Sequence, residues 1–317
     1  MSRLAPESIS YEANEGSLRK RANISRLEIV ALPEAPTRVQ ALMSGQVDID
    51  TDVAVDSIAA LKAARFQVDS TPASQVHGFS FITAKDGSPW KDKRLRQAAN
   101  YAVNKQAIVD NIYGGQATVA SQHAAPISFG YNPDVKPYPY DPAMAKKLLA
   151  EAGFPNGLEL TMNVVHTTMT LTNATQQVAN DLTAVGIKTN LISIPIPELI
   201  GKFLNGGWAP EIQAFNVGTD HTGHLDAGVG FSSFYSCAKK VQVYCDEAEM
   251  PLITAAAGEF NVDKRRQLLR DVLKMNHDNA PLIFMAEQRS NMGVHPKVKN
   301  FKNEVFVLNY HEMRIEP

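Results

Sequence analysis

The chain has 317 residues, of which 44% are hydrophobic and 20% charged, so wholesale disorder and fibrous repeats are excluded. Its 31 basic and 33 acidic residues leave a formal net charge of −2, which provides no global field to recruit nucleic acid or anionic lipid. No apolar run approaches the ~18–20 residues of a membrane span, and Met1–Gly16 lacks the apolar core of a signal peptide. We therefore expect neither element in this chain.

The first third of the chain has the pattern strand, helix, strand. Leu27–Leu32 is an apolar run rich in branched residues, and a helix is predicted from Pro36, which suits a first turn, to Gly45, which ends it. Val47–Asp50 alternates apolar and polar residues, as a half-buried strand does. This pattern predicts a parallel βαβ unit with a right-handed crossover.

Two consecutive helices are predicted after this unit. Asp92 caps the first and Asn104 the second, because such side chains accept hydrogen bonds from the free amides at a helix start. Each segment carries apolar residues at helical spacing, such as Leu95 and Ala99 in the first. A proline-rich loop follows, and Asp141-Pro142 then supplies the cap and first-turn proline of a third helix.

The second half of the chain continues to alternate strands with helices. Strands are predicted at Leu158–Val164, Ile187–Ile194, Ile212–Val217, Pro281–Met285 and Glu304–Leu308, and helices near Thr170–Val185 and Asp263–His277. Helices alternating with strands throughout predict an α/β protein with parallel or mixed sheets.

No enzyme signature accompanies this pattern. The sequence lacks a nucleophile elbow, a zinc-protease helix motif, a phosphate-binding loop and a complete dinucleotide fingerprint, so we assign no catalytic residue and no cofactor. The richest polar cluster is Asp220–Asp226, with two carboxylates and two imidazoles within seven positions. A metal site, a ligand-contact loop and a surface loop remain alternatives there, because the spacing fits no defined metal site.

The two cysteines, Cys237 and Cys245, lie eight positions apart. They are too few for a zinc site of about four ligands, and their spacing is not that of a Cys-x-x-Cys redox motif. Two free buried thiols and a short disulfide remain open.

The most specific stretch of the sequence is Pro89–Val109. It contains, in order, a proline, Asp92 with Arg94, Arg96-Gln97-Ala98, Tyr101-Ala102, and Asn104-Lys105 ahead of Ile108-Val109. This stretch resembles the signature of peptide/nickel-type (family 5) extracytoplasmic solute-binding proteins, which serve ABC importers. Asn104 stands where the family usually has aspartate, an exchange that keeps the helix cap.

Further stretches resemble other blocks of the same family, so that the resemblance covers essentially the whole chain. They are Tyr11–Asn14, Ala41–Ile49, Tyr138–Pro142, Ala145–Leu149 and Ala152–Pro155. Family members are much longer and carry additional sequence before the equivalent of Tyr11. The resemblance therefore leads us to expect an N-terminally truncated member whose first lobe is incomplete.

The resemblance implies a two-lobed periplasmic-binding-protein-like fold of type II, peptide-binding class. Residues 1–76 plus 286–317 would form a partial first lobe, and residues 77–285 the second. The chain would cross between lobes near His77–Phe79 and again near Met285-Ala286, and a ligand would be enclosed as the lobes close about these crossings.

The resemblance also implies ligand-binding residues. In peptide-binding members an aspartate after a strand accepts the ligand's α-ammonium group, and Asp220 matches that position, although Val217 replaces the family's aromatic residue. The candidate ligand-binding residues are Asp220, Thr219, His221, Phe215 and Phe79. The alternative for Asp220 is a turn-forming role.

The function implied by the resemblance is that of a substrate-binding component of an ABC importer, which delivers a short peptide or similar small polar solute to a membrane permease. The expected location is periplasmic or extracytoplasmic, and Cys237 and Cys245 would form a disulfide in that oxidising compartment. No catalysis, metal or nucleic acid is expected. The alternatives are a solute-sensing or interaction protein on the same scaffold and, third, an enzyme.

Overall fold

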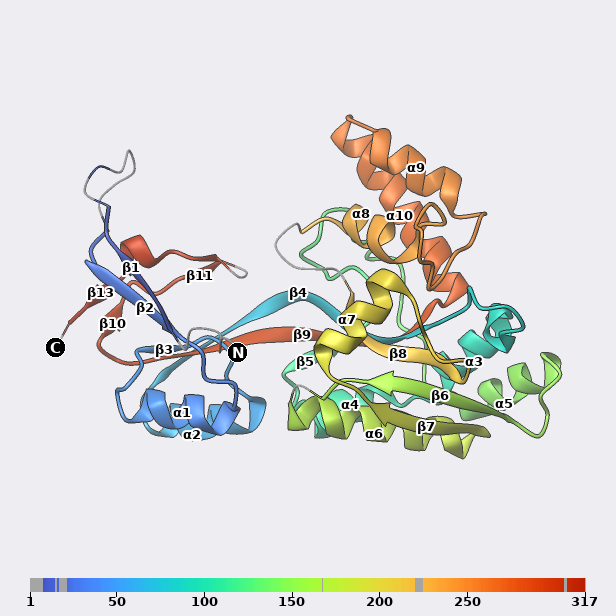
Figure 1. Cartoon of the computed structure of the whole chain (residues 1–317), viewed down its shortest axis with the longest axis horizontal. Coiled ribbons are helices and arrows are strands. Elements are labelled where there is room, and N and C mark those ends of the chain that lie inside the picture. Colours follow the sequence, from blue (N-terminus) through green and yellow to red (C-terminus); the bar gives the residue numbers. More distant parts are fainter. Residues whose placement is uncertain are drawn as a thin grey trace, which may run out of the picture. The chain divides into compact units, whose positions relative to one another are not determined.

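The computed structural model describes residues 8–14, 16, 22–166, 168–219, 225–304 and 307–316. The chain divides into two compact units, one formed by residues 1–72 and 289–317 (unit 1) and the other by residues 73–288 (unit 2). The chain passes from one unit to the other inside two long strands, β4 (Gln67–Phe81) and β9 (Leu282–Val294) (Figure 1). The boundaries expected from the sequence lie four and three residues from these points.

Unit 1 is built from short strand pairs and two helices. Antiparallel pairs join β1 (Ser8–Glu12) to β2 (Arg26–Val30), β10 (Val298–Lys299) to β13 (Arg314–Ile315), and β11 (Asn303–Glu304) to β12 (Val307–Leu308). Helices α1 (Ala35–Met43) and α2 (Ile58–Ala63) enclose a small core with the buried side chains of Val39, Leu42, Val53, Ile58 and Leu61.

The predicted parallel βαβ unit is wrong in its pairing. Its strand β2, helix α1 and strand β3 (Ile49–Asp50) all form, but β2 pairs with β1, and β3 pairs antiparallel with the end of β9. Alternation of apolar and polar residues specifies a strand and its buried face but not its neighbour, which is decided by residues far away in the sequence. Strands β1 and β4 and helix α2 were not predicted.

Unit 2 contains most of a seven-stranded sheet with the strand order β3-β9-β4-β8-β6-β7 and with β5 (Ala117–Val119) paired to β9. Strand β6 (Leu158–Val164) runs parallel to both β7 (Ile187–Ser193) and β8 (Ile212–Thr219), whereas β4 is antiparallel to β8. The sheet is therefore mixed, one of the two arrangements that the sequence left open.

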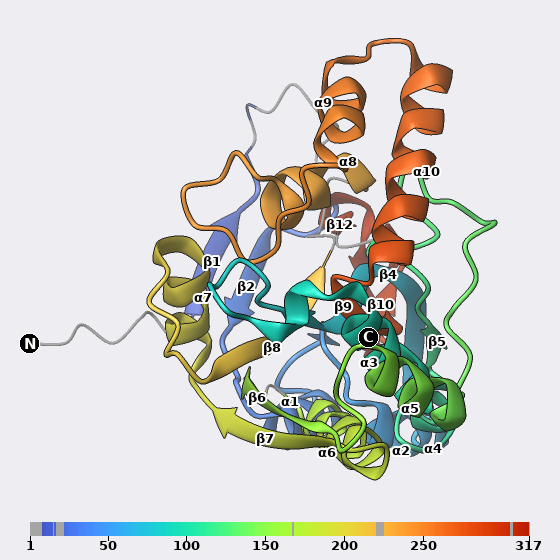
Figure 2. The same ribbon diagram turned by 90° about the vertical axis from the view of Figure 1, so that its right-hand side faces the viewer.

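Helices cover both faces of this sheet. A large apolar core lies between the sheet and α3 (Lys93–Ala102), α4 (Lys105–Asn111), α5 (Pro142–Glu151) and α6 (Met169–Ala184). On the other face, α7 (Ile196–Asn205) accompanies β8, while α8 (Ala227–Gly230) lies near the packed pair α9 (Met250–Gly258) and α10 (Val262–Asn279) (Figures 1 and 2).

The three predicted helix caps are confirmed. The side chain of Asp92 accepts from the amide of Arg94 at 2.9 Å, that of Asn104 from Ala107 at 3.1 Å, and that of Asp141 from Met144 at 2.9 Å. Among the described residues, none of the helices combines the length and apolar character needed to cross a bilayer.

Candidate functional site

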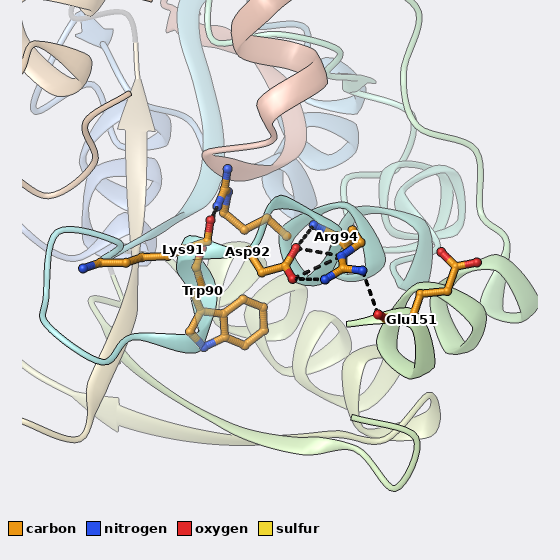
Figure 3. A network of polar contacts seen from close by, with 6 residues as sticks. Trp90, Lys91, Asp92, Arg94 and Glu151 are labelled. Carbon is orange, nitrogen blue, oxygen red and sulfur yellow. Dashed lines mark hydrogen bonds and ion pairs between the residues drawn. The ribbon is translucent and has the colours of Figure 1, made fainter. Parts of the chain in front are cut away.

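The specific stretch Pro89–Val109 builds the scaffold of unit 2. The Asp92 carboxylate, which caps α3, also receives the Arg94 guanidinium at 2.6 Å, and this contact lowers the pKa of Asp92. Arg94 donates further to the carbonyl oxygen of Glu151 at 2.7 Å, which ties α3 to the end of α5 (Figure 3). The buried Arg96 donates to the carbonyl oxygens of Trp90 and Asn279, so it joins α3 to the end of α10.

A second buried link lies between α3 and β9. The Asn100 side chain donates to the Leu282 carbonyl at 2.9 Å and accepts from the Phe284 amide at 3.2 Å. The Lys105 Nζ donates to the Asn100 carbonyl at 2.9 Å, and burial lowers the pKa of Lys105 to about 7. The polar residues of this stretch therefore make structural hydrogen bonds within unit 2.

A different region has the geometry of a ligand site, namely the sheet edge at which β6, β7 and β8 end. Because these strands are parallel, their carboxyl ends meet at one edge, where α/β proteins commonly bind ligands. The Asn216 side chain fixes this edge, since it accepts from the Val165 amide at 2.9 Å and donates to the Val165 carbonyl at 2.8 Å. Thr219, the last residue of β8, pairs with Val76 of β4.

The predicted ligand-binding residues fall partly at this edge. Asp220 and His221 follow Thr219 in the sequence and lie outside the described residues. For Thr219 itself, only the backbone position is described. Phe215 and Phe79 are buried in the interior: Phe215 stacks on Trp208 with ring centroids 4.8 Å apart, and Phe79 is 0% exposed in the large core. Their positions show a packing role, and their contact with a ligand stays a prediction.

The end of the Asp220–Asp226 cluster has a structural partner. Asp226 receives a two-pronged ion pair from Arg265, with distances of 2.6 and 3.0 Å, and it also caps α8 by accepting from the Gly228 amide. In the part of the chain that the structure describes, the one candidate metal cluster is Cys237, Cys245 and Glu247. Its two sulfurs form a disulfide, as predicted from the family resemblance, so they are not free to ligate a metal.

Glu287 on β9, opposite Thr118 of β5, is a further buried carboxylate of unit 2. The residue is 7% exposed, and none of the ion pairs among the described residues includes Glu287. Burial raises the pKa of Glu287 to about 7, and its charge contributes, after burial itself, to a raised pKa of Tyr131. A desolvated carboxylate without an ion pair costs free energy in a folded protein, which makes Glu287 a candidate site residue.

The strand register locates Glu287. Thr118 of β5 lies opposite Glu287, and the amide of Ala120 donates to the Met285 carbonyl at 3.3 Å. On β4, burial lowers the pKa of His77 to about 4, which keeps the imidazole neutral at pH 7.

The sequence pattern does not single out Glu287. The only signal is a glutamate directly after the apolar run Leu282–Ala286, where a central strand would continue with apolar residues.

The comparisons with known proteins agree with this architecture. The family described as "Bacterial extracellular solute-binding proteins, family 5 Middle" matches residues 1–238, and the chain therefore belongs to this family. By this description, the family consists of bacterial extracellular solute-binding proteins.

Among curated relatives, heme-binding protein A of Haemophilus influenzae is 28% identical over 305 residues, which are 95% of this chain and 55% of that protein. The dipeptide-binding protein of Escherichia coli is 27% identical over 304 residues, 92% of this chain and 55% of that protein. The chain thus spans about half the length of the curated relatives it matches.

A solved structure has the same fold. The periplasmic binding protein DppA from Helicobacter pylori, in complex with the peptide STSA, superimposes with a TM-score of 0.86 at 23% identity. The match covers 100% of this chain and 62% of that one. At this identity the likeness establishes the two-lobed binding-protein fold.

Proposed function

We propose that this chain acts as the substrate-binding component of an ABC importer and captures a short peptide or a similar small polar solute. Family membership supports this role, as do relatives named for dipeptide binding and a structural neighbour that holds a peptide. The observation that carries the proposal is the buried carboxylate of Glu287 on β9, which has no ion pair among the described residues and whose pKa burial raises to about 7.

The carboxylates of Glu287 and Asp220 favour a ligand with a cationic group. Glu287 lies buried without an ion pair among the described residues, and Asp220 follows the last residue of β8 in the sequence. A carboxylate desolvated by a ligand needs a positive partner or a raised pKa. The α-ammonium group of a peptide would supply that charge, with Asp220, Thr219 and His221 as further contacts and with Phe79 and Phe215 supporting the strands from within.

The remaining parts of the proposal follow from the family. Units 1 and 2 would correspond to the partial first lobe and the second lobe of a binding protein. The partner would be the membrane permease of an ABC importer, and the location periplasmic or extracytoplasmic. The protein would bind its solute without changing it covalently.

The test compares a free peptide with its neutralised form. The purified chain is titrated with the dipeptide Ala-Ala, with a mixed pool of dipeptides and tripeptides, and with the same peptides acetylated at the amino terminus, while native mass spectrometry records the complexes. We expect binding of free peptides and a loss of at least about thirtyfold on acetylation, because a buried charge pair is removed. Equal binding of both forms, or binding of no peptide, would contradict the proposal.

A further inference from the structure

The disulfide Cys237–Cys245 lies beside a third side chain that can bind a metal ion. The Cys245 Sγ atom lies 3.9 Å from Oε1 of Glu247, and the two sulfurs and a carboxylate oxygen of Glu247 all lie within 4.8 Å of one another. Both cysteines are half-buried and Glu247 is exposed, so a reductant or a metal ion in solution can reach them. We call these three residues the cysteine–glutamate cluster.

The backbone of Cys237 is held in place by contacts other than the disulfide. Its amide donates to the Sδ atom of Met250 at 3.3 Å, and its carbonyl oxygen accepts from the Gln242 side chain at 2.6 Å. The first contact ties Cys237 to the start of α9, and the second closes the loop between the two cysteines. Because neither contact involves the S–S bond, both can hold Cys237 in position when that bond is cut.

The segment that leads to Cys245 is anchored to the body of unit 2. The carbonyl oxygen of Val243 accepts from the amides of Thr83 and Ala84 at 2.9 and 3.1 Å. Val243 and Tyr244 are both buried, with 3% and 2% of their surface exposed. These contacts also do not involve the S–S bond. The Cα atoms of the two cysteines are 4.9 Å apart, so after reduction their sulfurs stay near enough to bind one ion together.

The donor atoms of the cysteine–glutamate cluster suit a thiophilic ion. Thiolate sulfur is a soft ligand that selects Zn²⁺ or Cu(I), whereas carboxylate oxygen alone suits hard ions such as Mg²⁺. Two thiolates and one carboxylate supply three ligands for Zn²⁺, and a water molecule can complete the tetrahedron, as in zinc sites that keep one open position. The thiolate is the form of cysteine that binds metals, so a metal ion needs the reduced pair.

We propose that Cys237, Cys245 and Glu247 form a zinc site that becomes available when the disulfide is reduced. A dithiol reductant transfers two electrons and two protons to the S–S bond, which gives two thiols, and the reductant itself becomes a disulfide. Zn²⁺ then replaces the two thiol protons, which leave to water, and the Glu247 carboxylate supplies the third ligand. The site does not depend on the solute that unit 2 binds.

The test measures Zn²⁺ binding by the full chain in its two redox states. The protein is reduced with a phosphine, because a dithiol would itself bind Zn²⁺, and is then freed of reductant without oxygen and titrated with Zn²⁺ against a coloured chelator. We expect the reduced chain to bind one Zn²⁺ with a Kd of about 1 µM or tighter, and the oxidised chain to bind at least about a hundredfold more weakly. Co²⁺ should give thiolate-to-metal charge-transfer absorption in the reduced chain alone. Equal binding in both states, or binding in neither, would overturn the proposal.

Matched variants assign the ligands. Under reducing conditions, Cys245→Ser removes one thiolate and should weaken Zn²⁺ binding at least about a hundredfold, and alkylation of the reduced wild-type chain tests the same ligands if this variant does not fold. Glu247→Gln leaves both cysteines in place and should weaken binding at least about tenfold, whereas Glu211→Gln, at an exposed carboxylate outside the cluster, should change it less than about twofold. An unchanged affinity in Glu247→Gln, or an equal loss in Glu211→Gln, would overturn the three-ligand site.

Discussion

The two units of this chain differ in how completely their strands are buried. In unit 2, helices lie on both faces of the sheet, and side chains such as Phe79 and Trp90 are completely buried. In unit 1, the principal core contains five buried apolar side chains, and every residue of β1 is exposed. One region of the chain thus has an extensive core of its own, whereas the other leaves the strands β1 and β2 largely exposed.

The largest expected effect tests whether the two units unfold separately. Both tryptophans, Trp90 and Trp208, belong to unit 2, so tryptophan fluorescence during denaturation reports on that unit alone. Phe79→Ala empties a fully buried site and should cost about 3–5 kcal/mol in the tryptophan-detected free energy of unfolding.

The control for this prediction is a core truncation in unit 1. Leu61→Ala removes an equally buried side chain there, and we expect it to leave the tryptophan-detected transition unchanged while it speeds amide exchange in α1 and α2. Phe260→Ala, at a side chain that is 97% exposed, should change neither signal. A shift of the tryptophan-detected transition by Leu61→Ala would show one cooperative unit instead.

A smaller effect is expected from the disulfide Cys237–Cys245, which closes a short loop in unit 2. Replacing both cysteines with serine should lower the tryptophan-detected stability by about 2–3 kcal/mol in the chain-entropy model, because the unfolded chain regains freedom. Thiol titration of the denatured, unreduced protein should find no free thiol. Two free thiols, or an unchanged unfolding free energy, would contradict this expectation.

The smallest predicted change concerns Gly78, where β4 approaches β9. A Cβ atom at this position would collide with the Ile283 carbonyl oxygen and with Leu282 Cδ1, so Gly78→Ala should destabilise unit 2 by about 1–3 kcal/mol. Gly201→Ala is the matched control, because nothing lies near that position on α7, and alanine favours a helix by about 0.5–1 kcal/mol. Destabilisation of equal size by both substitutions would rule out the close approach as the cause.

Sequence patterns predicted the local features of this fold well, because their causes are local. Asp92, Asn104 and Asp141 cap their helices as expected, since a cap depends on residues within one turn. The pairing of β2 and β3 was predicted wrongly, because strand partners are distant in sequence. Strand β1 was not predicted, although Ser8–Glu12 alternates polar and apolar residues; five residues are too short a pattern to stand out, and all of them are exposed in the structure.

The candidate site was predicted less completely than the fold. The family resemblance led to the end of β8, where Thr219 lies beside Val76. It did not lead to Glu287, because a single carboxylate after an apolar run has the same appearance in sequence whether it is buried or solvated. Only the packing around β9 distinguishes the two cases.

Glu287 also gives the pH dependence of stability a definite sign. The pKa of this carboxyl is raised to about 7 in the folded chain from an ordinary value near 4.5, so the folded state binds more protons between these values. Its contribution to stability is therefore present below about pH 4.5 and is lost as the pH rises through 7. The substitution Glu287→Gln changes the free energy of unfolding at each pH. We expect this change to be more stabilising at pH 8 than at pH 4.5 by roughly 3 kcal/mol.

The most direct test of the central claim is proton release on solute binding, measured by calorimetry at pH 7 in buffers of different ionisation enthalpy. A cationic solute beside Glu287 would lower its pKa from about 7, so binding of a free dipeptide should release up to about half a proton, while His77, with its pKa of about 4, stays neutral. In Glu287→Gln the release should vanish and the affinity fall. Equal proton release by the wild type and the variant would contradict the assignment of Glu287 to the solute site.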